Sequence, residues 1–480
     1  MTPHADGAIR RRRRECERVL VCPFTPPASS QITYQQPQIM QTFLLISFGQ
    51  LASLIGSGLT RFALGVWVFQ TTGSVTQFAL LNLFSYLPTI AISPLAGALV
   101  DRWDRRWVMI LSDSASGLGT VAIALLIYND GLQIWHIYAV ACVSAFFSAF
   151  QWPAYAAATT VLVPKQHLSR ANGVVQISKG AAKIAAPALS GFLLLTIQLQ
   201  GIVLIDIITF LFAVGTLLAV QFPKPEKLPH SEEPYGWQHL IAETKQGWHY
   251  IAQRPGMLAL ASFLTVPYFS LGVLDVLFWP FVLTFTTSAD LGLILSFGGC
   301  GWLVGSVAMS TWGGPKPRIH GVLLFVAFQG TLLLFGWVRP TVPIAAFGVF
   351  VYLCAYPIVV SSSQTIWHQK VPTDLQGRVF ALLQGMEKTA AIAAYTISGP
   401  LVDKVLSPML SPGGLLADNV GRFVGVGEGR GMAFLFILIG VLNLVATGIA
   451  YRYRRLRRLE LEIPDAIADE DESAAMEVVN

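Results

Sequence analysis

The sequence predicts an all-α polytopic membrane protein with twelve transmembrane helices, and three observations support this fold class. Hydrophobic residues make up 54% of the 480 residues and charged residues only 12%, which is too apolar for a soluble protein with a polar surface. Apolar runs of about 20 residues or more, enough to cross a bilayer as a helix, recur along the chain. The alternating short strands of a membrane β-barrel do not occur.

The apolar runs fall into two sets of six. A longer polar stretch, 222–256, separates the sixth run from the seventh. We expect the first six helices at 42–70, 74–100, 107–128, 134–162, 169–197 and 201–221. The last six are expected at 257–286, 290–312, 319–338, 341–369, 377–405 and 431–452.

The basic residues alternate from loop to loop. Most of the 32 Lys and Arg residues lie before the first run, after each even-numbered run and in the tail "YRYRRLRR". The opposite loops "QTTGS", "YNDGLQIW", "QLQ" and "TTSAD" hold none. Because basic loops stay on the cytoplasmic side, we expect both termini in the cytoplasm and the protein in the inner (plasma) membrane. The net charge of +5 follows from this topology and is no argument for nucleic-acid binding.

The two ends of the chain lack core-forming content. Residues 1–39 are interpreted as a disordered basic tail, with a twin-arginine export signal or a true start at Met40 as alternatives. Residues 456–480 are interpreted as an acidic cytoplasmic tail.

An internal repeat divides the rest of the chain. "VPKQHLSR" (163–170) aligns without gaps with "VPTDLQGR" (371–378), which indicates two six-helix halves at 40–221 and 257–455. In the linker 222–256, the apolar residues Trp237, Leu240, Ile241, Trp248 and Ile251 share one helical face. We expect this amphipathic helix to lie at the cytoplasmic membrane surface.

No motif indicates an enzyme, a metal site or a cofactor. The histidines form no paired-ligand pattern, and the five cysteines have no metal-ligand spacing. The phosphate-binding loop of an ATP-driven pump is absent from the sequence.

A cluster of charge stands between the second and third runs, in "GALVDRWDRR" (97–106). This segment resembles the loop signature of the major facilitator superfamily, Gly-x-x-x-Asp-Arg-x-Gly-Arg-Arg, with Asp104 in place of the second glycine. Segments such as "TTGS", "WPAYAAATTVLVPKQHLSRANG" and "ETKQGWHYIAQRPGM" resemble the branch that holds the enterobactin exporter and drug-efflux proteins. The matching signature positions are Gly97, Asp101, Arg102, Arg105 and Arg106.

The resemblance implies two halves that rock against each other, with a latch on the cytoplasmic face. Asp101 is expected to meet the N-terminus of the eleventh helix, near Leu375 to Arg378, where the helix dipole favours an anion. The arginines of the signature are expected to pair with acids or helix C-termini across the same seam. The alternative is that they only fix topology.

Charged residues inside the expected helices are the second group of candidates, because charge is costly there and usually functional. Loss of water favours the protonated form of a carboxyl group, so these acids are candidates for carrying a proton. Fixed ion pairs between helices are the alternative, and Asp113 and Lys179 lie close enough to the interface to reach water. The proton-coupling or substrate-binding candidates are Asp275, Asp206, Arg61, Lys183, Glu387 and Asp113.

The sequence therefore predicts a secondary transporter, monomeric in the lipid bilayer, that exports a siderophore, drug or metabolite by alternating access as a proton antiporter. An importer of a small polar solute on the same fold is the first alternative. A non-transporting assembly or sensing protein is the second.

Overall fold

A computed structural model of the chain describes residues 36–100, 103–163, 167–220, 237–335 and 341–466. Within these ranges the secondary structure is helical, with no strand. The described residues from Thr42 onward belong to one compact unit. The predicted tail 1–39 lies outside the described residues except for 36–39, which begin the first helix.

Within the described residues, twelve long helices occupy the predicted positions, which confirms the predicted fold class. The first half holds α2 (Gln36–Thr72), α3 (Val75–Val100), α4 (Arg105–Tyr128), α5 (Ile134–Leu162), α6 (Leu168–Thr196) and α7 (Gln198–Ala219). The second half holds α9 (Pro255–Leu283), α10 (Ser288–Trp312), α11 (Arg318–Phe335), α12 (Val342–Lys370), α13 (Thr373–Leu401) and α16 (Arg430–Arg452).

Ten of these twelve described helices are long and apolar enough to cross a membrane on their own. The other two, α6 and α13, are equally long but carry charged residues in their interiors. On the outer face of α4, Leu111, Leu118 and Leu125 are each more than half exposed at a spacing of seven residues. A stripe of this kind faces lipid rather than water.

The helix ends follow from local capping. The Asp104 carboxylate accepts a hydrogen bond from the backbone N–H of Arg106 (2.9 Å) and begins α4. The Thr287 hydroxyl does the same for the N–H of Asp290 at the start of α10, which ends at Gly313 with a φ of 77°. Gly73, with a φ of 62°, makes the tight turn between α2 and α3.

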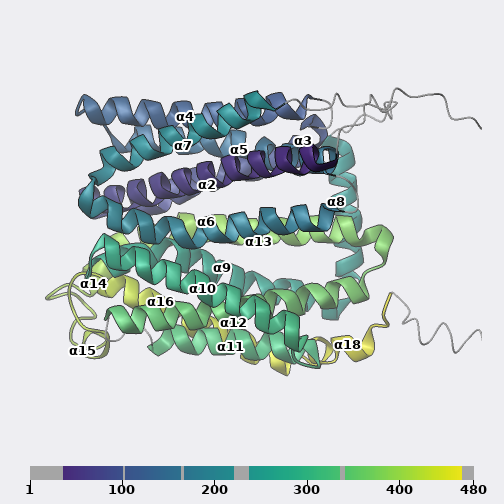
Figure 1. The fold of residues 1–480 in the computed structure, drawn as a ribbon. Helices are drawn as coiled ribbons and strands as arrows, with labels where there is room; N and C mark the ends of the chain where they lie inside the picture. The colour runs from purple at the N-terminus through teal and green to yellow at the C-terminus, as the bar shows by residue number, and fades with distance from the viewer. Residues whose placement is uncertain (1–35, 101–102, 164–166, 221–236, 336–340, 467–480) are drawn as a thin grey trace, which may run out of the picture. The chain divides into compact units, whose positions relative to one another are not determined.

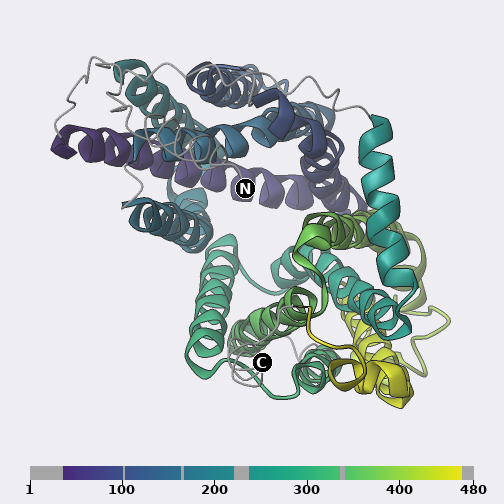
Figure 2. The ribbon, with the colours of Figure 1, turned by 90° about the vertical axis from the view of Figure 1, so that its right-hand side faces the viewer.

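The two halves repeat the same packing. In the first half α3 packs on α5 and α4 on α7, and in the second half α10 packs on α12 and α11 on α16. The halves meet where α6 contacts α10 and where α3 contacts α13. Seen along the helices, they form two groups (Figure 2). These matched pairs agree with the internal repeat in the sequence.

The helix α8 (Trp237–Ala252) lies across the ends of the long helices (Figure 1). We call this end of the bundle the linker end, and the opposite end, which carries the segments 73–74 and 402–429, the far end. The Tyr250 hydroxyl donates to the Lys370 carbonyl (2.7 Å), and Ile251 is fully buried. Burial raises the pKa of Tyr250, so the hydroxyl stays a neutral donor. The last turns of α8 thus pack on the second half, and the place of this helix at the cytoplasmic membrane surface stays a prediction.

The first residues of the predicted acidic tail are also packed. Two short helices, α17 (Arg454–Arg457) and α18 (Leu459–Glu462), follow α16, and Leu456 and Leu459 are buried. The Glu460 carboxylate accepts from the N–H groups of Arg318 (3.2 Å) and Ile319 (3.0 Å), which caps α11. Residues 467–480 lie outside the described residues.

Lys370 holds this segment in place. Its side chain is 4% exposed, and its ammonium group donates to the carbonyls of Glu460 (2.9 Å) and Ile463 and pairs with Asp465 (2.7 Å). Lys370→Ala leaves the two carbonyls without their charged donor, so we expect a loss of about 1.5–3 kcal/mol in the free energy of unfolding. Thermal unfolding of the detergent-purified protein measures it. Lys316→Ala, an exposed lysine at the same end, is the control. Equal melting temperatures for the two variants would contradict the role of Lys370.

Candidate functional site

A cavity of about 820 Å³ opens between helices of the first half and α13 of the second. Its wall is rich in hydroxyl and amide groups from α2, α3, α4 and α5, and α7 contributes Asp206 and Phe210. Four charged side chains line it: Arg61, Asp113, Asp206 and Lys388. The structure therefore brings three of the predicted site residues to one cavity.

Asp113 is buried in this wall. The sequence places it close enough to the membrane–water interface to reach water, and the structure corrects this expectation. Its carboxylate accepts from the Gln50 side-chain amide (2.8 Å) and from the Gln151 amide. Gln151 also donates to the Gln50 carbonyl oxygen (3.1 Å). The three side chains come from α4, α2 and α5, so one carboxylate connects three helices through neutral donors.

Asp206 on α7 has a similar environment. It is 2% exposed, and its two oxygens accept from the hydroxyls of Ser57 (3.2 Å) and Thr120 (3.0 Å). Neither Asp113 nor Asp206 makes an ion pair with any residue that the structure describes. Both carboxylates are thus supplied with hydrogen bonds but not with a positive charge.

Asp275 faces the space between the halves from the interior of α9. Its side chain is exposed, although Leu274 and Val276 beside it are buried. The Tyr395 hydroxyl on α13 donates to the Asp275 carboxylate (3.0 Å). The charges of Lys183 and Arg61 act on this carboxylate from the first half, but no ion pair joins them within the described chain. The fixed ion pair considered from the sequence is not formed here.

The lysines of the interface lie over aromatic rings. The Lys183 ammonium is 4.6 Å from the centre of the Trp302 ring, and that of Lys388 is 5.6 Å from the Tyr86 ring. The Tyr86 ring in turn packs on Tyr395, with ring centres 5.4 Å apart. Tyr86 lines the cavity, so this row of side chains leads from the cavity to Asp275.

Two further charged residues considered from the sequence, Lys179 and Glu387, make other contacts. Lys179 on α6 lies over the Trp152 ring, 2.8 Å from its centre. Glu387 on α13 is half-buried, and its charge acts on the hydroxyls of Tyr268 and Tyr356. Glu387 therefore belongs to the second half's side of the interface and is not among the residues that line the cavity.

The signature residues lie at the linker end. Gly97 is in the last turn of α3, while Asp101 and Arg102 lie outside the described residues. The Arg106 guanidinium donates to the carbonyls of Leu217 (3.1 Å) and Leu218 (2.8 Å), so it caps the C-terminus of α7. This contact is with a helix C-terminus, as expected, but within one half and not across the seam.

The other two basic residues of the predicted latch differ in their contacts. Arg105 is half-buried and makes no hydrogen bond or ion pair with the residues that the structure describes. Arg378 lies in the second turn of α13, and its carbonyl faces Gly247 of α8, where an added Cβ would be 3.0 Å away. The N-terminus of α13, the expected partner of Asp101, thus has α8 beside it.

The seam between the halves is closed at the far end and open at the linker end. At the far end, a Cβ added to Gly191 of α6 or to Gly292 of α10 would collide with the backbone of the opposite helix. A Cβ added to Gly399 of α13 would be 2.6 Å from the Cα of Thr76 on α3. Toward the linker end, the same helices have open space within 4 Å of Gly173, Gly180, Gly377 and Gly385.

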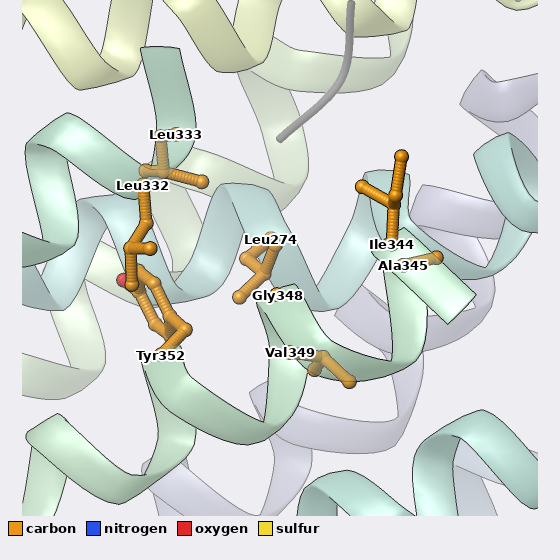
Figure 3. Close-up of a pocket in the computed structure, with 8 residues that line it drawn as sticks. All are labelled: Leu274, Leu332, Leu333, Ile344, Ala345, Gly348, Val349 and Tyr352. Atoms are coloured by element: carbon orange, nitrogen blue, oxygen red, sulfur yellow. The ribbon is translucent and has the colours of Figure 1, made fainter. Parts of the chain in front are cut away.

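A second pocket, in the second half, has no functional character. Its volume is about 10 Å³, close to the least that holds one water molecule. Figure 3 shows its wall, which is aliphatic apart from Tyr352. We interpret it as a packing defect. In the described chain no group of three His, Cys, Asp or Glu side chains could hold a metal ion.

The comparisons with known proteins agree with this geometry. The sequence model of the Major Facilitator Superfamily matches residues 46–395. The chain is 25% identical over 371 residues to macrolide efflux protein A of Streptococcus pyogenes, over 76% of this chain and 90% of that protein. It is also 25% identical over 371 residues to the multidrug efflux pump Tap of Mycobacterium bovis, over 75% and 86% of the two chains.

Solved structures support the same fold. The nucleoside transporter NupG superposes with a TM-score of 0.63 at 14% identity, over 86% of this chain and all (100%) of that chain. A bacterial homologue of the iron transporter ferroportin, in an inward-facing state, gives 0.62 at 13% identity, over 85% and 98%. At these identities the likeness concerns the fold alone.

The cap that Arg106 makes on α7 leads to a stability test. Arg106→Ala removes a charged donor from two carbonyls, so we expect the free energy of unfolding to fall by about 1.5–3 kcal/mol. Arg105→Ala, one residue away and without such contacts, is the matched control. Thermal unfolding in detergent compares them, and a larger loss in Arg105→Ala would contradict the assignment.

Proposed function

This chain is a member of the major facilitator superfamily of membrane transporters, and we propose that it exports a small organic compound across the plasma membrane in exchange for protons. The observation that carries the proposal is a set of three carboxylates held by neutral donors: Asp113 and Asp206 in the cavity wall, and Asp275 facing the space between the halves. Such groups can accept a proton or a cationic substrate without first breaking an ion pair.

The outward direction is supported by the efflux proteins to which the chain is similar. The size of the cavity supports an organic substrate, because pockets for small molecules commonly measure about 300–1,000 Å³. A siderophore, a drug or a metabolite of that size fits this range. One chain contains both halves, so we propose that it works as a monomer.

In alternating access, the linker end and the far end of the bundle open in turn, each to one side of the membrane. The linker end carries the basic loops, so we assign it to the cytoplasm. The open linker end and closed far end then correspond to a state that loads substrate from the cytoplasm. When the linker end closes, Asp101 meets the N-terminus of α13, while Arg106 keeps α7 in place behind the loop.

Asp275 is our proposed proton carrier. It belongs to the second half, whereas Arg61 and Lys183, whose charges act on it, belong to the first. Protonation changes the net charge of these three groups from +1 to +2 and removes the attraction between the halves. Binding and release of one proton would therefore alter how strongly the halves hold together at this point.

Asp113 and Asp206 are our proposed substrate-binding acids. Both line the cavity and both lack a cation among the described residues. A basic group on the substrate would supply that cation, and Tyr86 and Phe210 of the same wall offer aromatic surface to its apolar part.

The topology can be tested with reporter fusions. We expect a reporter fused after Arg458 to be cytoplasmic and one inserted at Asn129–Gly131 to be external, because the first position is at the linker end and the second at the far end. Alkaline phosphatase and a fluorescent protein serve as the reporters. Both positions on one side of the membrane would contradict the assignment of the two ends.

The proton role can be tested by separating coupled transport from exchange. Asp275→Asn should abolish substrate uptake driven by a pH gradient in inverted vesicles, since the proton site is gone. It should spare exchange of labelled for unlabelled substrate, which moves no net proton. A panel of dyes, antibiotics and siderophores supplies the substrate.

The control for this test is Asp418→Asn, an exposed acid in the segment between α13 and α16. Tyr395→Phe, which removes the hydroxyl that donates to Asp275, should reduce coupled uptake to an intermediate level. If Asp275→Asn keeps both activities, the proton role passes to Asp206 or Glu387. Transport by no compound in the panel, in either direction, would favour the non-transporting alternative.

A further inference from the structure

An acid from the second half binds the first turn of a helix in the first half. Asp403 lies in the π-helical turn η2 (Val402–Leu406) that follows α13. Its carboxylate accepts from the Ser74 hydroxyl (2.7 Å) and from the backbone N–H groups of Thr76 (2.8 Å) and Val75 (3.2 Å). These donors form the start of α3, so one carboxylate makes three hydrogen bonds across the seam.

The sequence "TTGS" shapes the loop that receives this carboxylate. The Thr72 hydroxyl accepts from the Ser74 N–H (3.1 Å), and Gly73 adopts a φ of 62°. The Ser74 oxygen accepts from the Gln77 N–H (3.3 Å) while its hydroxyl donates to Asp403. The first N–H groups of α3 therefore point out of the loop, where the helix dipole favours an anion.

The surroundings make this contact depend on closure of the far end. One turn before Asp403, Gly399 packs so closely on Thr76 that an added Cβ would be 2.6 Å from its Cα. Lys404 beside Asp403 is exposed, and no lysine or arginine in the described residues pairs with Asp403. The Asp403 charge is thus compensated by the α3 N-terminus, and this compensation is lost when the helices separate.

The helices α3 and α13 are antiparallel, so each end of the pair brings one C-terminus beside one N-terminus. At the far end, the acid after α13 binds the start of α3. At the linker end, Asp101 follows α3 and is expected at the start of α13. The same physical contact can therefore serve both ends, made at one while it is broken at the other.

We propose that Asp403 is the latch of the far end, which holds it closed while the cavity faces the linker end and releases it when the substrate leaves. The proposal rests on alternating access as the proposed function. It gives a role in transport to the "TTGS" loop and to an acid at the end of α13, which lies outside the cavity.

The test measures how often the far end opens. The five native cysteines are replaced by serine, and Ser85→Cys places a reporter in the cavity wall on α3. A membrane-impermeant maleimide added outside intact cells reaches this cysteine only through the far end. We expect Asp403→Asn to raise the labelling rate about fivefold or more, the range of a single coupling contact. Asp418→Asn, an exposed acid of the same external segment, should leave the rate unchanged.

A second variant and a second measurement keep the test decisive. Ser74→Ala removes one of the three donors and should give a smaller rise, and it carries the test if Asp403→Asn fails to insert. Ser74→Cys combined with Asp403→Cys should form a disulfide under oxidation that stops transport, with recovery upon reduction. The latch is overturned if Asp403→Asn is labelled at the wild-type rate, or if Ser74→Ala is when that variant carries the test. It is also overturned if transport continues with the disulfide formed.

These outcomes separate the latch from the function on which it rests. Unchanged labelling in a variant that still transports substrate rejects the latch and leaves the exporter intact. Faster labelling in a protein that transports no compound supports the latch as a structural contact and rejects the exporter.

Discussion

The hydrocarbon core of the bilayer offers no water, and this constraint shapes the polar features inside the helix bundle. A carboxylate inside a helix bundle must find hydrogen-bond donors, a cation or a water-filled space. Asp113 and Asp206 find amides and hydroxyls from neighbouring helices, and Asp275 finds Tyr395. Each of these hydrogen bonds ties helices together, and none of the three carboxylates forms an ion pair within the described residues, which is the condition that a proton or a cationic substrate can use.

The positive charges are satisfied by a different chemistry. Lys179, Lys183 and Lys388 lie over Trp152, Trp302 and Tyr86. Such contacts contribute about 0.5–2 kcal/mol each, less than a buried ion pair costs to break. Cations and anions are thus kept apart within one interface. A bundle fixed by buried ion pairs would resist the change of charge that proton coupling requires, whereas this arrangement permits it.

The sequence predicted the helices well and the site only in part. The twelve spans lie within a few residues of their predicted bounds because the bilayer fixes their length, and even the more charged α6 and α13 were predicted as apolar runs. Arg61, Asp113 and Asp206 could be chosen because charge stands out in an apolar run. Their hydrogen-bond partners could not be chosen from the sequence, because Gln50, Gln151 and Thr120 are ordinary polar residues until packing decides which helix faces which. Asp403 escaped notice because an acid at a helix end is usually solvated, and only the fold brings the start of α3 to it.

The strength of the proposed latch contacts matches the energy that one proton would supply in each cycle. An anion at a helix N-terminus contributes about 0.3–2 kcal/mol. A proton that moves down a gradient of one pH unit releases about 1.4 kcal/mol, and a membrane potential of 100 mV adds about 2.3 kcal/mol per charge. One such contact at each end can therefore be broken by one proton, whereas a bidentate arginine pair with several supporting hydrogen bonds would exceed that supply. The choice of a carboxylate facing backbone N–H groups, in place of a salt bridge, follows from the need to release the contact in every cycle.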